Sequence, residues 1–206
     1  MSTYKIISGH QTGVDMASTL AARESGLEIG GYAPQGYWTE RGPNMNLKKW
    51  GLKDFHVRGY DQRDRANVEM CDLVIAFRLD RPKTGRGTTK TLNYAYKGSY
   101  VDSKYPTFSD AQSNGTIELM PAQSSNRPVM IVWDPMTHKN SGEYSTLIAN
   151  FIKKQKPANG SDQVVVLFSG PCESTCQGIQ DYVKGILKGA FEQLITHKLP
   201  KANCVI

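Results

Sequence analysis

The sequence has few cysteines and no long apolar run. Its four cysteines are too few and too unevenly spaced for the disulfide framework of a secreted domain: Cys71, Cys172, Cys176 and Cys204. No stretch approaches the roughly 20 apolar residues that a membrane-spanning helix needs. Residues 1–5 also lack the apolar core of a signal peptide. We therefore expect a cytoplasmic protein with reduced thiols and no membrane partner.

The chain also lacks a strong charge of one sign. Its 25 Lys and Arg exceed its 19 Asp and Glu by 6, and the basic residues are scattered rather than arranged along one element. This mild positive charge suits a small anionic ligand and gives little support to a nucleic-acid partner. From the length of 206 residues, we expect a single domain over residues 1–206.

Short apolar runs alternate with helical patterns along the chain. Residues 4–7, 73–77, 129–133 and 164–168 are continuous runs typical of strands buried on both faces. The clearest helical spacing of three and four joins Ile179, Val183, Ile186, Leu187, Ala190 and Leu194. The alternation indicates crossover connections in an α/β fold, with a doubly wound, mostly parallel sheet and helices on both faces.

Residues 98–127 differ from their surroundings because they are rich in Gly, Ser, Thr, Pro, Asn, Asp and Gln. A loop of this length is uncommon inside a compact domain. We interpret it as a polar insertion, which leaves open a lid, a binding loop, a contact in a homo-oligomer or no specific role.

Three glycine-bearing turns each follow a predicted strand and precede a helix, at residues 8–15, 84–91 and 169–174. Ligands of open parallel sheets bind at the carboxyl ends of the strands, and the free N–H groups of a helix start attract phosphate. We therefore expect the three turns to form one pocket for an anion. The middle turn, before a helix expected over residues 89–97, is not a Walker loop, because it lacks the Gly-Lys-Ser/Thr ending.

The motifs resemble those of a known family. Residues 7–15 (ISGHQTGVD), residues 30–36 (GGYAPQG), Arg63 with Asn67, Gly87-Thr88 with Thr91, and residues 170–174 (GPCES) follow its order and spacing. The chain is similar to the putative molybdenum carrier family, also called the circularly permuted YpsA-like branch of the SLOG superfamily. Its relatives include the LOG and DprA Rossmann-like domains. Here His10 replaces the second glycine of the motif SGGQTGVD, and Cys172 replaces the arginine of GPRES.

The resemblance implies a Rossmann-like fold and a ligand in the shared crevice. The implied ligand is a nucleotide, an ADP-ribose-like molecule, molybdate or molybdenum cofactor, held by a carrier, sensor or sponge. The resemblance also favours a homo-oligomer. The candidate ligand-binding residues are Ser8, Gly9, His10, Gln11, Thr12, Asp15, Pro34, Arg63, Asn67, Gly85, Gly87, Thr88, Thr91, Gly170, Pro171, Glu173 and Ser174.

An enzyme that cleaves the N-glycosidic bond of a nucleotide is the alternative. LOG-type phosphoribohydrolases carry a Gly-Gly-x-Gly-Thr-x-x-Glu motif, and the resemblance places Thr91 at the position of its glutamate. Threonine cannot supply a carboxylate near neutral pH, so a binding protein is favoured. If the protein is an enzyme, the candidate catalytic carboxylates are Glu173 and Asp15.

Aromatic and sulfur-containing side chains near these turns suggest further roles. Tyr32, Tyr37 and Trp38 are candidates to stack on a base, although we expect at least one of them in the core. Cys172 is a candidate reactive thiol at a helix start. Because Cys172 and Cys176 have no second pair of ligands, we expect no structural zinc site.

Overall fold

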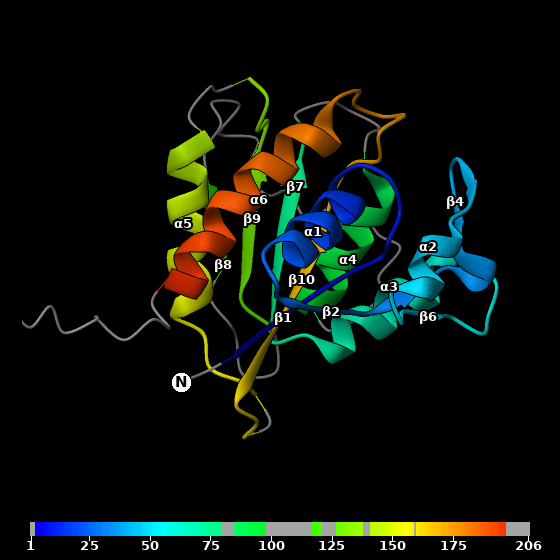
Figure 1. Ribbon diagram of the computed structural model, residues 1–206, viewed down its shortest axis with the longest axis horizontal. Coiled ribbons are helices and arrows are strands. Elements are labelled where there is room, and N and C mark those ends of the chain that lie inside the picture. Colours follow the sequence, from blue (N-terminus) through cyan, green and yellow to red (C-terminus); the bar gives the residue numbers. More distant parts are fainter. Residues whose placement is uncertain are drawn as a thin grey trace, which may run out of the picture.

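The computed structural model describes residues 3–79, 85–97, 117–120, 127–137, 141–158 and 160–196. Within these ranges, six strands form the main sheet (Figure 1), in the order β2 (Glu28–Gly30), β1 (Thr3–Ser8), β10 (Gln163–Ser169), β7 (Leu73–Arg78), β9 (Val129–Trp133) and β8 (Ile117–Met120). All neighbours pair in parallel except β8, which runs antiparallel to β9 at the edge. The carboxyl ends of β1, β10 and β7 therefore lie side by side.

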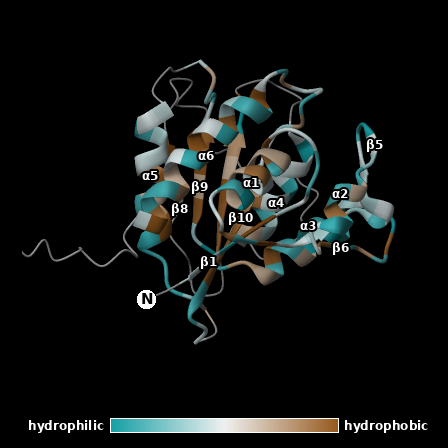
Figure 2. Ribbon diagram, viewed as in Figure 1, coloured by the Kyte–Doolittle hydropathy of each residue, from teal (hydrophilic) through white to brown (hydrophobic). Residues whose placement is uncertain are grey.

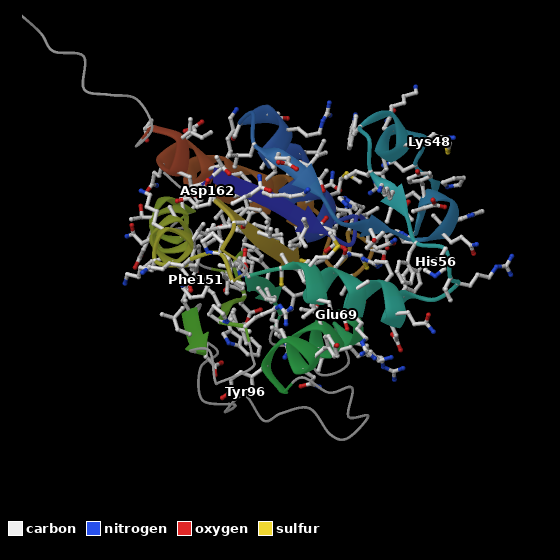
Figure 3. All side chains as sticks on the ribbon, turned by 90° about the horizontal axis from the view of Figure 1, so that it is seen from below. Lys48, His56, Glu69, Tyr96, Phe151 and Asp162 are labelled. Carbon is white, nitrogen blue, oxygen red and sulfur yellow. The ribbon has the colours of Figure 1, made fainter. Side chains whose placement is uncertain are left out.

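Helices cover both faces of this sheet, because its central strands are apolar on both sides (Figure 2). The larger core lies under α1 (Val14–Glu24), α5 (Ser141–Lys153) and α6 (Ile179–Thr196). The smaller core lies under α3 (Tyr60–Met70) and α4 (Arg86–Lys97). Figure 3 shows α3 with Glu69 and α4 with Tyr96 on one side of the sheet, and α1 and α6 on the other.

A small substructure connects β2 to α3 beyond the β2 edge of the sheet (Figure 1). It pairs β3 (Tyr32–Ala33) with β6 (Lys53–Asp54), and β4 (Trp38–Thr39) with β5 (Gly42–Pro43). The short helices η1 (Gln35–Tyr37) and α2 (Met45–Lys49) complete it. A separate apolar cluster of Met16, Ala33, Leu47 and Leu52 packs it against α1.

The structure confirms the α/β fold and the four strands predicted from apolar runs. It extends three of them by one or two residues and starts α4 at Arg86, three residues before the expected Thr89. Of the polar insertion, Ile117–Met120 forms the edge strand β8, and residues 98–116 and 121–126 lie outside the described part of the chain. None of the helices in the described ranges is apolar and long enough to cross a bilayer.

Candidate functional site

One cavity of about 380 Å³ lies where the carboxyl ends of β1, β10 and β7 meet. All three glycine-bearing turns contribute to its wall, as expected from parallel strands. The start of α3 and the loop between β4 and β5 add the rest. The lining residues are Gln11, Asp15, Glu40, Tyr60, Asp61, Arg63, Asp64, Gly85, Arg86, Gly87, Thr88, Lys90, Ser169, Gly170, Pro171, Cys172 and Thr175.

Arg63 brings a buried positive charge into this cavity. Its side chain extends from the first turns of α3 over the glycine at position 9 and is only 4 % exposed. Its Nη1 lies 3.1 Å from Oδ1 of Asp64. Its Nε has no hydrogen-bond partner among the described residues. A buried guanidinium that is incompletely satisfied is costly, so this group is suited to receive an anion.

Two aspartates flank the guanidinium of Arg63. Burial raises the pKa of Asp15 to about 7, even though the charge of Arg63 opposes the shift. Burial likewise raises the pKa of Asp64 to about 6, again against the charge of Arg63. Oδ2 of Asp15 also accepts a hydrogen bond from the backbone N–H of Gln11, at 3.3 Å. Both carboxyls can therefore exchange protons near neutral pH.

The start of α4 forms another part of the cavity wall. Gly85 adopts φ +78°, and its carbonyl accepts the N–H of Thr89 at 2.8 Å. Gly87 and Thr88 of the first turn line the cavity together with Arg86 and Lys90. The Nζ of Lys90 lies 2.6 Å from Asp61. A helix start with basic side chains is a favourable environment for phosphate.

The start of α1 differs from the expectation of free N–H groups. The N–H of Val14 donates to the carbonyl of Pro171 at 3.1 Å, and the N–H of Gly13 donates to Oε1 of Gln180 at 3.2 Å. A Cβ at Gly170 would lie 2.5 Å from Cγ2 of Val14. The third turn therefore engages the N–H of Val14, and α6 engages the N–H of Gly13, so neither amide is free to bind an anion.

Glu40 is a contributor that the sequence analysis missed. It lies between β4 and β5 and accepts hydrogen bonds from the hydroxyls of Thr12 and Ser174 and, at 3.1 Å, from the N–H of Ser174. Partial burial raises the pKa of Glu40, but the hydrogen bonds from Ser174 and Thr12 outweigh this and keep it below its usual range. Thr12 and Ser174, predicted to hold ligand, thus anchor a carboxylate at the rim.

Several other predicted residues are engaged within the protein. Asn67 is buried and bridges two loops: its Nδ2 donates to the carbonyls of Ser8 and Tyr32, both at 3.1 Å, and its Oδ1 accepts the N–H of Tyr32 at 2.7 Å. The Ser8 hydroxyl donates to the carbonyl of Asp15 at 3.1 Å. The Thr91 hydroxyl donates to the carbonyl of Gly87 at 3.1 Å. These side chains shape the cavity but do not line it.

His10 is also buried rather than facing a ligand. Its Nε2 lies 2.9 Å from the carbonyl of Gly30, and its Nδ1 lies 3.0 Å from the hydroxyl of Thr19. Burial lowers the pKa of His10 to about 3, so the ring is neutral and donates from Nε2. His10, one of the candidate ligand-binding residues, is therefore engaged within the protein and does not line the cavity.

Glu173 caps a helix. Its Oε1 accepts the N–H of Gly178 at 2.5 Å, and its Oε2 accepts the N–H of Gln180 at 3.0 Å, at the start of α6. This occupies both carboxylate oxygens, and Glu173 does not line the cavity. Of the two candidate catalytic carboxylates, the structure places only Asp15 in the pocket.

The remaining candidates fall at the edges of the site. Pro34 lines a neighbouring cavity of about 540 Å³ rather than the main one. Cys172 lines the main cavity, with its Sγ 3.0 Å from the hydroxyl of Thr175. The described part of the chain brings no three His, Cys, Asp or Glu side chains into an arrangement that would hold a metal ion.

Comparisons with known proteins agree with this fold. Residues 6–101 match the circularly permutated YpsA SLOG family. The crystal structure of a "putative molybdenum carrier protein" from Syntrophus aciditrophicus is similar, with a TM-score of 0.66 and 20 % sequence identity over 92 % of this chain and 95 % of that chain. No curated protein sequence matches the chain significantly.

Proposed function

We propose that the cavity at the carboxyl ends of β1, β10 and β7 binds a nucleotide or a nucleotide-derived phosphorylated ligand, in a chain whose residues 6–101 match the circularly permutated YpsA SLOG family. The observation that carries this proposal is the buried guanidinium of Arg63, which lines the cavity with its Nε unpartnered among the described residues. A phosphate near Arg63 and the start of α4 would meet the positive charge of this guanidinium.

The carboxylates of the pocket favour a nucleotide over a bare oxyanion. The cavity is lined by three basic side chains and by four acidic ones, which are Asp15, Glu40, Asp61 and Asp64. Carboxylate oxygens accept hydrogen bonds from sugar hydroxyls, but they repel a second anion. A ligand with a phosphate at one end and hydroxyls at the other fits this distribution better than molybdate, although the similar solved structure is named a molybdenum carrier.

Isothermal titration with AMP, ADP-ribose, ribose 5-phosphate and molybdate tests the proposal. We expect the phosphorylated sugars to bind and molybdate to bind more weakly. Arg63→Gln should lower the affinity for AMP at least about tenfold, since hydrogen bonds to charged groups contribute about 1.5 to 3 kcal/mol. Arg65→Gln is the matched control, because Arg65 lies on the same helix but is exposed and pairs with Glu69. Absence of binding to every phosphorylated probe would refute the proposal.

Asp15 supports a second candidate function, the cleavage of a nucleotide N-glycosidic bond. It is a buried carboxyl in the pocket, and its pKa, raised to about 7 by burial, suits general acid–base chemistry at neutral pH. Incubation with nucleoside monophosphates and chromatography for free base would detect the activity. Turnover that Asp15→Asn abolishes and Asp162→Asn retains would support an enzyme. The control residue, Asp162, is exposed and precedes β10, at the opposite end of the sheet.

A further inference from the structure

A second cavity adjoins the proposed phosphate site. It has a volume of about 540 Å³ and is lined by Pro34, Gln35, Gly36, Trp38, Arg58, Gly59 and Tyr60. Tyr60 also lines the main cavity, so the two cavities share a wall. Both volumes lie in the range of about 300 to 1,000 Å³ that is common for small-molecule sites.

Two large aromatic side chains in this cavity are exposed. Trp38 is 57 % exposed and Tyr60 is 53 % exposed. By contrast, Tyr37 and Tyr32, the other two aromatic candidates, make contacts within the protein. The hydroxyl of Tyr37 donates to the carbonyl of Leu52 at 3.1 Å, and the ring of Tyr32 packs edge-on against Phe55 with centroids 5.3 Å apart. Exposed aromatic rings that share a cavity are suited to stack on a planar group.

The position of Trp38 is tied to the main cavity. The carbonyl of Trp38 accepts a hydrogen bond from Nε2 of Gln11 at 2.9 Å, and Gln11 lines the main cavity. Two residues further on, Glu40 joins the same strand pair to the first and third turns through Thr12 and Ser174. The indole also lies against Gly36, where a Cβ would be 3.2 Å from Cδ1 of Trp38. The backbone at Trp38 is therefore anchored beside the proposed phosphate site.

Tyr60 lines both cavities and contacts Arg63 of the main one. Its ring centroid lies 5.8 Å from the guanidinium carbon of Arg63, within the range of a cation–π contact. A ligand whose anionic group meets Arg63 would therefore place the group attached to it beside Tyr60. In a nucleotide the phosphate is joined to a ribose and the ribose to a base, so the groups follow in the order that the two cavities require.

We propose that the cavity lined by Trp38 and Tyr60 is a base-binding subsite, so that the ligand is a nucleotide whose base stacks there while its phosphate lies near Arg63. This inference rests on the proposed function and adds the requirement for an aromatic base. A phosphorylated sugar without a base would use the main cavity alone.

Calorimetric titration of AMP and of ribose 5-phosphate separates the two claims. We expect the protein to bind AMP at least about tenfold more tightly than ribose 5-phosphate, in line with measured base stacking on aromatic side chains. Trp38→Ala should lower the affinity for AMP about five- to tenfold and leave that for ribose 5-phosphate unchanged. Tyr60→Ala should lower the affinity for AMP more than that for ribose 5-phosphate, because Tyr60 also lines the main cavity and contacts Arg63. Trp38→Phe and Tyr60→Phe, which keep a ring, should retain most of the affinity. Leu147→Ala, an exposed position on α5, is the surface control.

Tryptophan fluorescence gives a second readout. AMP should quench part of the emission of the native protein, ribose 5-phosphate should not, and Trp38→Phe should remove the quenching. If AMP and ribose 5-phosphate bind equally and Arg63→Gln abolishes both, the subsite is refuted while the proposed function stands. If Trp38→Ala weakens both probes equally in a protein with a native circular dichroism spectrum, the subsite is also refuted. If neither of these probes nor ADP-ribose binds, both proposals fail.

Discussion

The guanidinium of Arg63 occupies the space that a side chain at Gly9 would need. A Cβ at position 9 would lie 1.5 Å from Nη1 of Arg63 and 2.6 Å from Oδ2 of Asp15. The glycine of the first turn thus leaves room for a side chain that arrives from a helix 54 positions further along the chain. It does not leave an open amide for the ligand itself.

Gly9→Ala should therefore weaken ligand binding by displacing Arg63. We expect the affinity for AMP to fall at least about tenfold, the loss of a hydrogen bond to a charged group, as measured by calorimetry. Gly185→Ala is the matched control, because a Cβ there meets open space on α6. That substitution should stabilise the protein by about 0.5 to 1 kcal/mol. Unchanged AMP binding by Gly9→Ala would mean that Arg63 is not a ligand contact.

Asp15→Asn should stabilise the protein at high pH. Because burial raises the pKa of Asp15 from 3.8 to about 7, the folded state holds the proton more tightly than the unfolded state. The native stability that this group contributes therefore falls as the pH rises from about 4 to about 7. The difference should reach at most about 4 kcal/mol above pH 7, since one pKa unit corresponds to about 1.4 kcal/mol.

Urea unfolding of the native protein and of Asp15→Asn at pH 5 and pH 8 measures this difference. The advantage of the variant should be larger at pH 8. Equal advantages at both pH values would show that the folded protein does not hold the raised pKa of Asp15. Asp162→Asn, at an exposed position, is the matched control.

His10 should remain neutral in the folded protein down to acidic pH. Burial lowers its pKa from 6.5 to about 3, so the unfolded state binds the proton first, and the stability from this group is lost as the pH falls from about 6.5 towards 3. NMR spectra of the imidazole should show no titration of this ring between pH 8 and pH 5. A midpoint near pH 6 would contradict the buried hydrogen bond to Gly30.

Asn67→Ala should destabilise the protein through lost hydrogen bonds rather than lost contact with ligand. The substitution leaves the carbonyls of Ser8 and Tyr32 and the N–H of Tyr32 without this partner. We expect a loss of about 2 to 4 kcal/mol in the free energy of unfolding, from urea titration. Asn46→Ala, at an exposed position on α2, should change stability by less than about 0.5 kcal/mol.

Glu173→Gln distinguishes a helix cap from a catalytic carboxylate. Since Glu173 accepts the N–H groups of Gly178 and Gln180, the variant should lose about 0.5 to 2 kcal/mol of stability. It should retain its affinity for AMP. The matched control is Glu192→Gln, at an exposed position further along α6. A loss of turnover or binding without a loss of stability would restore Glu173 as a functional residue.

The sheet was predictable because its central strands are buried on both faces and therefore appear as unbroken apolar runs. Residues 129–133 are an example: four of the five are buried. The connection between β2 and α3 was not predictable in the same way. Its strands are two residues long, too short for a period to appear in the sequence.

The site was predicted in outline, because the order of the strands brings three turns to one edge, but the roles of single residues were not. The side chain of Gln180 accepts the N–H of Gly13, which lies 167 positions earlier in the chain. Local sequence spacing cannot predict a contact between residues so far apart. The position of Glu40 in the site depends on the pairing of β4 with β5, strands too short to be recognised in the sequence. Asp64 could have been found, because it follows Arg63 and lies four positions after Tyr60, on one face of a helix.

The contact between Gly170 and Val14 makes one side of the pocket rigid. Neither glycine of this junction can accept even a methyl group, since a Cβ at Gly13 would lie 2.2 Å from the carbonyl of Pro171 and one at Gly170 would lie 2.5 Å from Val14. Related proteins with the same junction could therefore change ligand preference only through the facing elements, the start of α4 and the β4–β5 tip. Substitutions that alter the ligand of this site are thus expected at the start of α4 and at the β4–β5 tip, and not at the junction of the first and third turns.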